Sequence, residues 1–232
     1  MKTAYLGPEG SYSSLAARKL CPTAEYLPRK SFYAAVSCVL ACEADCAVLP
    51  VENTLQGAVA QNLDLLYANA ELFAVKEYLL QIDHRLIFRR GVNLSRIERV
   101  FSHEQAILQC GKFLSEKLPQ AKIVYTDSTA ESLSVMQKET DAGIVGAHMA
   151  REGYELSAEN IADEKKNFTH FLLVKRGEEH LPVHSGRVYF AASCPHEPGA
   201  LLKMLQILAV YDLNMTKIES RPKKDSPGEY NF

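Results

Sequence analysis

The sequence contains no tryptophan, no apolar run of about 18 residues and almost no net charge. Without such a run no transmembrane helix is expected, and residues 1–5 lack the basic-then-apolar pattern of a secretion leader. A net charge of −2 provides no electrostatic attraction to nucleic acid or to an anionic membrane. We therefore expect a cytoplasmic protein that binds neither nucleic acid nor membrane.

Motifs for nucleotide binding and for serine hydrolases are also absent. Neither Gly-x-x-x-x-Gly-Lys-Ser/Thr nor Gly-x-Gly-x-x-Gly occurs, and there is no Gly-x-Ser-x-Gly elbow. Cys38, Cys42 and Cys46 follow one another at intervals of four, but on a helix the outer two would lie about 12 Å apart. One zinc ion with bonds of about 2.3 Å cannot bind both. The cysteines therefore indicate no metal site.

Strand-like and helix-like segments alternate along residues 2–67 and again along residues 99–148. The expected helices include one from Ser31 to about residue 43, one after His103 to about Lys117 and one after Thr129 to about Gln137. This alternation is typical of an α/β fold with a largely parallel sheet. Residues 72–89 differ, because they have strand composition and no turn signal before Gly91. A run of that length can pass from one sheet to another, and a second passage is expected near 160–170. We therefore predict two α/β lobes with a ligand cleft between them.

Polar residues stand where predicted strands give way to predicted helices. At such junctions in parallel sheets, helix N-termini present free N–H groups and a partial positive charge, which suit a carboxylate or phosphate. Any one of these residues alone is explained as a helix cap, but four junctions, two from each lobe, favour a small anionic ligand. The junctions are Ser11, Asn53–Thr54, Ser102–His103 and Ser128–Thr129.

The stretch Asn167–Phe171 places a hydroxyl where a polar loop enters an apolar strand. Taken alone it is explained as a strand start, with Asn in the turn and Thr as a β former. Together with the four junctions, it suggests that Thr169 carries a hydrogen-bond donor into the cleft.

Several of these segments resemble the prephenate dehydratase family, in the expected order from residue 1 to about residue 175. The stretches that carry the resemblance are 4–13, 50–54 with Gly57, 63–66, 102–106 with 109–110, 127–130 and 167–171. Ser11 and Thr54 each replace one hydroxyl residue of the family by another. His170 stands where the family has Arg, and because His is shorter and half-protonated near pH 6.5, we expect weaker, pH-dependent substrate affinity.

The resemblance implies conversion of prephenate to phenylpyruvate, with loss of water and carbon dioxide, in L-phenylalanine biosynthesis and without a cofactor. Thr169 and Asn53 are the expected catalytic residues. A threonine hydroxyl is too weakly acidic for a matched general acid, so Thr169 is expected to polarise the departing hydroxyl as a donor. The expected substrate-binding residues are Ser11, Tyr12, Thr54, Gly57, Ser102, His103, Gln105, Ser128, Thr129, Ala130, Asn167, His170 and Phe171.

The resemblance implies a two-lobed, periplasmic-binding-protein-like catalytic domain with a cleft between its lobes. It is expected to span residues 1–180, with lobe one at about 1–76 and 163–180 and lobe two at about 77–162. A linker at 181–186 is expected to lead into an ACT regulatory module at 187–232, a partial α+β (ferredoxin-like) unit. Within it we predict a strand over 186–194, a helix over 199–209 and a strand over 213–220. An ACT module is a βαββαβ unit, so this one is expected to be truncated.

The resemblance further implies a homodimer or tetramer that binds phenylalanine as an allosteric ligand, and truncation would put this feedback in doubt. The implied phenylalanine-binding residues are Gly199, Ala200, Leu201, Leu202, Glu219, Ser220, Arg221 and Pro222. Three other functions stay open at the level of sequence. They are an arogenate dehydratase, a prephenate decarboxylase that does not aromatise its product, and a non-catalytic two-lobed binding protein for an anionic metabolite.

Overall fold

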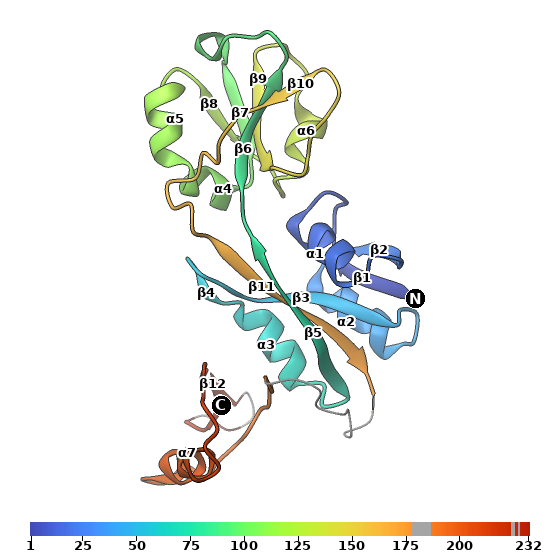
Figure 1. Cartoon of the computed structure of the whole chain (residues 1–232), viewed down its shortest axis with the longest axis vertical. Helices are drawn as coiled ribbons and strands as arrows, with labels where there is room; N and C mark the ends of the chain where they lie inside the picture. Colours follow the sequence, from blue (N-terminus) through green and yellow to red (C-terminus); the bar gives the residue numbers. More distant parts are fainter. Residues whose placement is uncertain (178–186, 224–225, 227) are drawn as a thin grey trace. The chain divides into compact units, whose positions relative to one another are not determined.

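A computed structural model describes residues 1–177, 187–223, 226 and 228–232 (Figure 1). The chain divides into two compact units, Met1–Glu179 and His180–Phe232. The first unit contains two sheets, and the second contains one described helix and a short strand pair.

The first sheet has the strand order β2-β1-β3-β11-β5, with β4 beside β3. Strand β1 is parallel to β2 and β3, whereas β11 is antiparallel to β3 and β5. The expectation of a largely parallel sheet is therefore only partly right, because β5 and β11, the two strands next to the lobe passages, are antiparallel to the strands they pair with. The strands are β1 (Lys2–Leu6), β2 (Glu25–Arg29), β3 (Cys46–Asn53), β4 (Gly57–Ala58), β5 (Leu72–Gln81) and β11 (Phe168–Arg176).

Helices cover both faces of this sheet. Helix α1 (Tyr12–Leu20) packs on a core that includes Tyr5, Val48 and Phe171. Helices α2 (Phe32–Leu40) and α3 (Ala60–Tyr67) pack on the other face, with Leu49 and Leu172. Helix α2 ends at Leu40 and not at about residue 43 as expected, because the chain turns back and two following N–H groups donate to the carbonyl of Cys38.

The second sheet has the order β10-β6-β9-β7-β8. Strand β7 is parallel to β8 and β9, and β6 is antiparallel to β9 and β10. The strands are β6 (His84–Arg89), β7 (Arg99–Ser102), β8 (Lys122–Tyr125), β9 (Asp141–Gly146) and β10 (Tyr154–Leu156). The helical segments are η1 (Leu94–Arg96), α4 (Glu104–Gln109), α5 (Gly111–Lys117) and α6 (Ser132–Val135).

Two helices of this lobe differ from expectation. The single helix predicted to run to Lys117 is divided at Cys110, where the N-terminus of α5 meets a carboxylate: the N–H of Lys112 donates to Asp163 at 3.1 Å. The helix predicted to end near Gln137 is only one turn long. It stops because the N–H groups of Gln137 and Lys138 donate to the Asp141 carboxylate and do not continue the helix.

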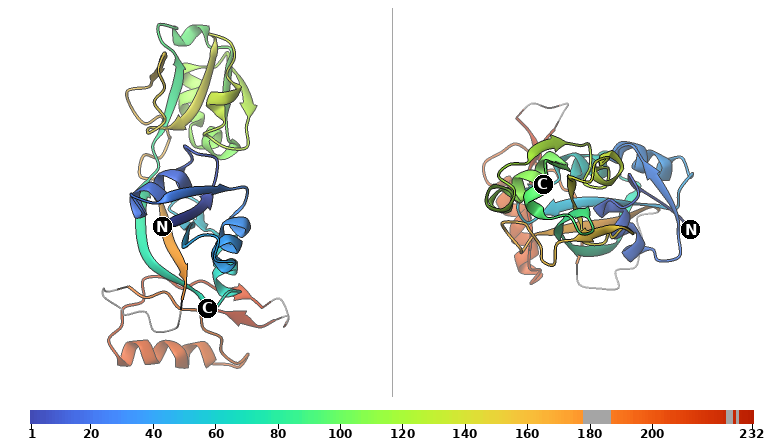
Figure 2. Two further views of the ribbon diagram at one scale, coloured as in Figure 1. Left: turned by 90° about the vertical axis from the view of Figure 1, so that its right-hand side faces the viewer. Right: turned by 90° about the horizontal axis from the view of Figure 1, so that it is seen from above.

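The two sheets are joined by one short and one long passage. Strand β5 belongs to the first sheet and β6 to the second, and only Ile82 and Asp83 separate them (Figures 1 and 2). The chain returns from β10 through residues 157–167 into β11. This confirms the two-lobed α/β fold and the passages expected near 72–89 and 160–170.

The second unit contains α7 (Ala200–Val210), β12 (Arg221–Pro222) and β13 (Tyr230–Asn231). Helix α7 matches the predicted helix. Residues 187–194 form only an isolated bridge, Ser193 with Asn231, and residue 186 lies outside the described part. Residues 213–220 do not form the predicted strand. Their side chains are mostly exposed, so no packing holds them extended. None of the described helices is long and apolar enough to cross a membrane.

Candidate functional site

The centre of the candidate site is a side-chain contact between β3 and β11. Thr169 lies opposite Asn53 in the strand register, and both are buried. The Asn53 amide donates to Thr169 Oγ1 at 2.9 Å. Its carbonyl oxygen accepts the N–H groups of Leu55 and Gln56 at 3.0 and 3.2 Å, which fixes which end of the amide faces Thr169. Asn53 therefore donates to a lone pair of the Thr169 hydroxyl oxygen. The hydroxyl proton of Thr169 stays available for another acceptor.

A buried amide chain extends this contact into the second lobe. Asn167 is 1% exposed; its Oδ1 accepts from Asn53 Nδ2 at 2.8 Å, and its Nδ2 donates to Gln109 Oε1 at 3.2 Å. Gln109 is the last residue of α4. Gln105, which was expected in the site, lies one helical turn earlier, and its N–H contacts the His103 ring. The usable signal for Gln109 was its place in the family-like stretch 102–110.

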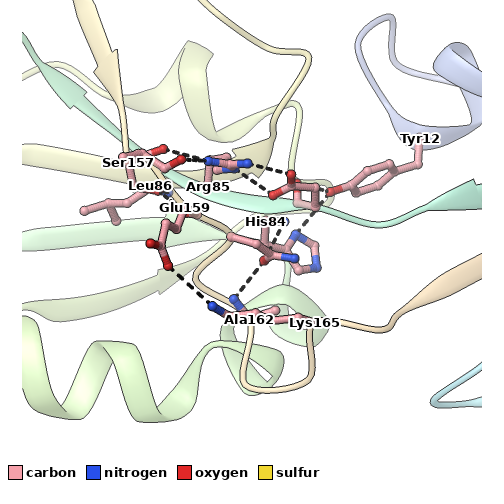
Figure 3. A network of polar contacts seen from close by, with 11 residues as sticks. Tyr12, His84, Arg85, Leu86, Ser157, Glu159, Ala162 and Lys165 are labelled. Carbon is pink, nitrogen blue, oxygen red and sulfur yellow. Dashed lines mark hydrogen bonds and ion pairs between the residues drawn. The ribbon is translucent and has the colours of Figure 1, made fainter.

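His84, at the start of β6, is the next member of this chain. Its Nε2 lies 3.0 Å from Gln109 Oε1 and its Nδ1 lies 3.3 Å from the Tyr12 hydroxyl. That hydroxyl also donates to the Asp83 carbonyl at 2.9 Å. Figure 3 shows Tyr12 pointing from its own segment toward His84. Burial lowers the pKa of His84 below its ordinary value, although the hydrogen bond with Gln109 opposes this. Burial likewise raises the pKa of Tyr12, so both side chains are neutral near pH 7.

The passage between β5 and β6 is held by an ion pair. Arg85 Nε and Nη2 each lie 2.7 Å from an oxygen of the Asp83 carboxylate. Arg85 also donates to the backbone carbonyls of Ser157 and Ala158 on the returning passage. Figure 3 shows this arrangement beside Tyr12 and His84. The residues around His84 are thus fixed from both passages.

A second contact between the lobes involves His148. Its Nε2 lies 2.8 Å from the carbonyl oxygen of Gly10, and its ring packs edge-on against Tyr12 with centroids 5.5 Å apart. Burial lowers the pKa of His148 as well. Gly10 has φ +83°, and a Cβ there would lie 3.0 Å from Met149 Cε. The positive φ favours glycine at this position, because an L side chain would strain the backbone next to the contact between the lobes.

The hydroxyls at the predicted junctions mostly bind backbone. Ser11 caps α1 and donates to the Leu6 carbonyl, and Ser102 donates to the Ile144 carbonyl at 2.8 Å. Thr54 Oγ1 accepts the N–H of Phe168. His103 caps α4, and Ser128 Oγ accepts the N–H of Glu131. Asn53–Thr54 does not open a helix as expected: it leads into a turn and β4, and α3 begins only at Ala60.

The remaining predicted residues are not part of the amide chain. His170 alternates to the sheet face opposite Thr169, where its Nε2 lies 3.0 Å from Glu77 Oε2. Phe171 belongs to the core beneath α1. Gly57 begins β4 with φ +77°, and Thr129 and Ala130 lie in the turn before α6.

The residues predicted to bind phenylalanine lie in the second unit. Gly199 is the cap of α7 with φ +82°, Ala200, Leu201 and Leu202 form its first turn, Glu219 and Ser220 precede β12, and Arg221 and Pro222 form β12.

Comparison with known proteins identifies the family. The family described as prephenate dehydratase matches residues 3–179. The prephenate dehydratase of Amycolatopsis methanolica is 35% identical over 237 residues, covering 100% of this chain and 77% of the relative. A solved structure of prephenate dehydratase in complex with L-Phe, from Arthrobacter aurescens, is 32% identical with a TM-score of 0.87. That match covers 100% of this chain and 78% of the other.

Related proteins do not all carry the same activity in their names. Arogenate dehydratase 2 of Petunia hybrida is 35% identical over 229 residues, covering 96% of this chain and 57% of the relative. A solved structure described as a quorum-quenching acylase is 28% identical with a TM-score of 0.81, covering 100% of this chain and 84% of that one. Family membership and choice of substrate are therefore separate questions.

The chain spans 64% of the length of the bifunctional chorismate mutase/prephenate dehydratases of Aquifex aeolicus and Neisseria gonorrhoeae. The family match nevertheless covers most of the chain and contains every member of the amide network from Tyr12 to Thr169. The chain belongs to the prephenate dehydratase family.

Proposed function

We propose that this protein converts prephenate to phenylpyruvate, with loss of water and carbon dioxide, in L-phenylalanine biosynthesis. The observation that carries the proposal is the buried contact from Asn53 Nδ2 to Thr169 Oγ1. In this reaction the ring hydroxyl departs, the carboxylate is lost and the ring becomes aromatic, so the driving force lies in the substrate. The protein has to hold a dianion and stabilise a departing hydroxide.

Thr169 serves as the donor to that departing hydroxide. Because Asn53 donates to the threonine oxygen, the hydroxyl proton is directed elsewhere and becomes a better hydrogen-bond donor. A threonine hydroxyl is too weak an acid to be a matched general acid near neutral pH. One positioned donor in a site that excludes water contributes roughly 3–4 kcal/mol to transition-state stabilisation.

Gln109 supplies a second donor. Its Oε1 accepts from both Asn167 and His84, so the opposite end of the amide, Nε2, is left for the substrate. Among the described residues, none accepts a hydrogen bond from this Nε2. The hydroxyls of Ser11 and Thr54 already bind backbone groups. The free N–H groups at the start of α1 are therefore better placed than those hydroxyls to bind a substrate carboxylate.

The test measures phenylpyruvate formation from prephenate. The readout is the absorbance of the product enolate in alkali. The wild-type protein should turn over, and Thr169→Ala should lower kcat about 10²- to 10³-fold with little change in KM. Thr169→Ser keeps the hydroxyl and is the matched control. Unchanged turnover in Thr169→Ala would refute the role of this residue.

The same assay separates the alternatives. An arogenate dehydratase releases phenylalanine from arogenate, and a decarboxylase that does not aromatise gives no alkaline enolate signal. A binding protein would show saturable prephenate binding without turnover.

We further propose that the second unit is an ACT module that binds phenylalanine and associates in a homodimer or tetramer. A relative was solved in complex with L-Phe. The second unit has a cavity of about 120 Å³ whose lining includes Ala200 and Leu201, both expected phenylalanine-binding residues. Leu202, Ile207 and Val210 of α7 are exposed apolar residues that a second chain could cover. Light scattering and the dependence of rate on phenylalanine concentration test this proposal.

A further inference from the structure

The contact between His84 and Gln109 has a consequence for the direction in which the Gln109 amide points. A glutamine amide has an accepting oxygen at one end and a donating nitrogen at the other. Turned around, the amide would set its own N–H groups against the N–H groups of Asn167 and His84. Asn167 Nδ2 donates to Gln109 Oε1, and its own direction is fixed because its Oδ1 accepts from Asn53.

His84 is held so that it can act as the second donor. Its side chain is 3% exposed, and Gln109 Oε1 lies 3.0 Å from Nε2, so the proton of the neutral ring belongs on Nε2. Nδ1 then faces the Tyr12 hydroxyl at 3.3 Å. The Tyr12 hydroxyl is itself anchored on the Asp83 carbonyl, and Arg85 fixes the Asp83 side chain.

We propose that His84 is a positioning residue for the reaction: its Nε2–H holds the Gln109 amide with Nε2 directed at the substrate. The ring does not touch the reacting atoms, because Nε2 donates to Gln109 and Nδ1 faces the Tyr12 hydroxyl, whose proton goes to the Asp83 carbonyl. Tyr12 comes from lobe one and His84 begins lobe two, so this orientation is complete only when the lobes are in contact. This inference rests on the proposed dehydratase function.

Two substitutions at His84 separate positioning from packing. In His84→Gln the amide nitrogen falls near the position of Nε2 and keeps the donor to Gln109. In His84→Asn the shorter amide falls near Nδ1 and can contact Tyr12 but not Gln109. We expect His84→Asn to lower kcat about 10- to 100-fold with KM within about threefold of wild type. His84→Gln should retain at least about a third of the wild-type kcat.

A double-mutant cycle with Gln109→Ala tests the route of the effect. If His84 acts through Gln109, His84→Asn should cause no further loss of kcat in the Gln109→Ala background. His148→Asn is the matched control, because His148 is also a histidine with a lowered pKa, packed against Tyr12 in a contact between the lobes, but it has no contact with Gln109. This control should show no coupling to Gln109→Ala, and thermal melts of all variants show whether each is folded.

Each outcome decides between the two proposals. A wild-type protein that does not turn over prephenate overturns the proposed function and this inference with it. Wild-type turnover with a folded His84→Asn of normal kcat overturns this inference alone. So does an equal loss of kcat in His84→Asn and His84→Gln, or an undiminished effect of His84→Asn in the Gln109→Ala background.

Discussion

Thr169 and His170 are adjacent in the family-like stretch but serve different faces of the sheet. Thr169 joins Asn53 and the amide chain, whereas His170 contacts Glu77 on the neighbouring strand β5. The sequence alone could single out Thr169 and Asn53 as candidates because they lie in recognisable motifs. It could not show that they touch, because that depends on the register between β3 and β11, 116 residues apart in the chain.

Substitution of His170 tests whether this position contacts substrate. His170 lies on the sheet face opposite Thr169, where an arginine would reach Glu77 as the histidine does. His170→Arg should therefore keep the KM for prephenate within about threefold of the wild-type value between pH 6 and 8. Steady-state kinetics across that range provide the measurement. A large fall in KM, with loss of its pH dependence, would instead support the substrate contact expected from the sequence.

Substitution of Asn53 tests the direction of the hydrogen bond to Thr169. In Asn53→Asp the carboxylate can only accept, so it would bind the Thr169 proton that the substrate needs. We expect kcat to fall by about 100-fold or more. The double variant with Thr169→Ala should lose little beyond Thr169→Ala alone, and additive losses would contradict the mechanism.

At the scale of elements, the sequence predicted the positions of most strands but not the ends of several helices. Helix α6 ends after one turn because the Asp141 carboxylate takes the next backbone donors and also binds Arg99 through two bonds of 2.8 Å. Helical propensity carries no information on such a contact, since Asp141 and Arg99 lie on different strands, β9 and β7. The prediction that a helix begins at Asn53–Thr54 was wrong for a similar reason. The Asn53 side chain accepts the N–H of Leu55 and closes a turn there.

Asp141 should accordingly be important for the stability of lobe two. Burial raises the pKa of its carboxyl, but the pair with Arg99 and the two backbone donors outweigh this and lower the pKa overall. Asp141→Asn loses the charge and turns an amide N–H toward the donors, so at least one of the four accepted bonds is lost, which should reduce the free energy of unfolding by about 2–3 kcal/mol. Denaturant unfolding would measure the change, with Glu98→Gln on the exposed surface as control. Equal stability of the two variants would refute this role.

At the scale of the molecule, the two-lobed fold could be predicted because the uninterrupted strand composition of residues 72–89 is a local property. The chain from Thr169 to Tyr12 could not be predicted, because its members come from five helices and strands and from the returning passage, and they meet only after both passages have formed. His84 was missed for this reason, since it looks ordinary in its own strand. Gln109 lay in a family-like stretch, but no role was predicted for it.

His84 and His148 should make the contact between the lobes sensitive to acid. Burial lowers the pKa of both His84 and His148 below the ordinary value of 6.5, so the unfolded chain binds more protons than the folded chain just below that pH. The free energy of unfolding should therefore fall as pH drops below about 6.5, by at most about 1.4 kcal/mol per pH unit for the buried His84 and by less for the exposed His148. Denaturant unfolding between pH 7 and 5 would show a shallower decline in the His84→Gln/His148→Gln variant. An unchanged slope would contradict this assignment.

The unequal lengths of the two passages define a pivot. Ile82 and Asp83 leave almost no slack between β5 and β6, whereas residues 157–167 form a longer tether that ends at Asn167. The two passages are hydrogen-bonded to each other, because the N–H of Ile82 donates to the Asn167 carbonyl and the N–H of Ile161 donates to the His84 carbonyl. The longer passage carries the residue that joins Gln109 to Asn53. We expect a rotation of the lobes about these passages to break the contact between Asn167 and Gln109. Thr169, the proposed donor, would then be supported from both lobes only while that contact is made.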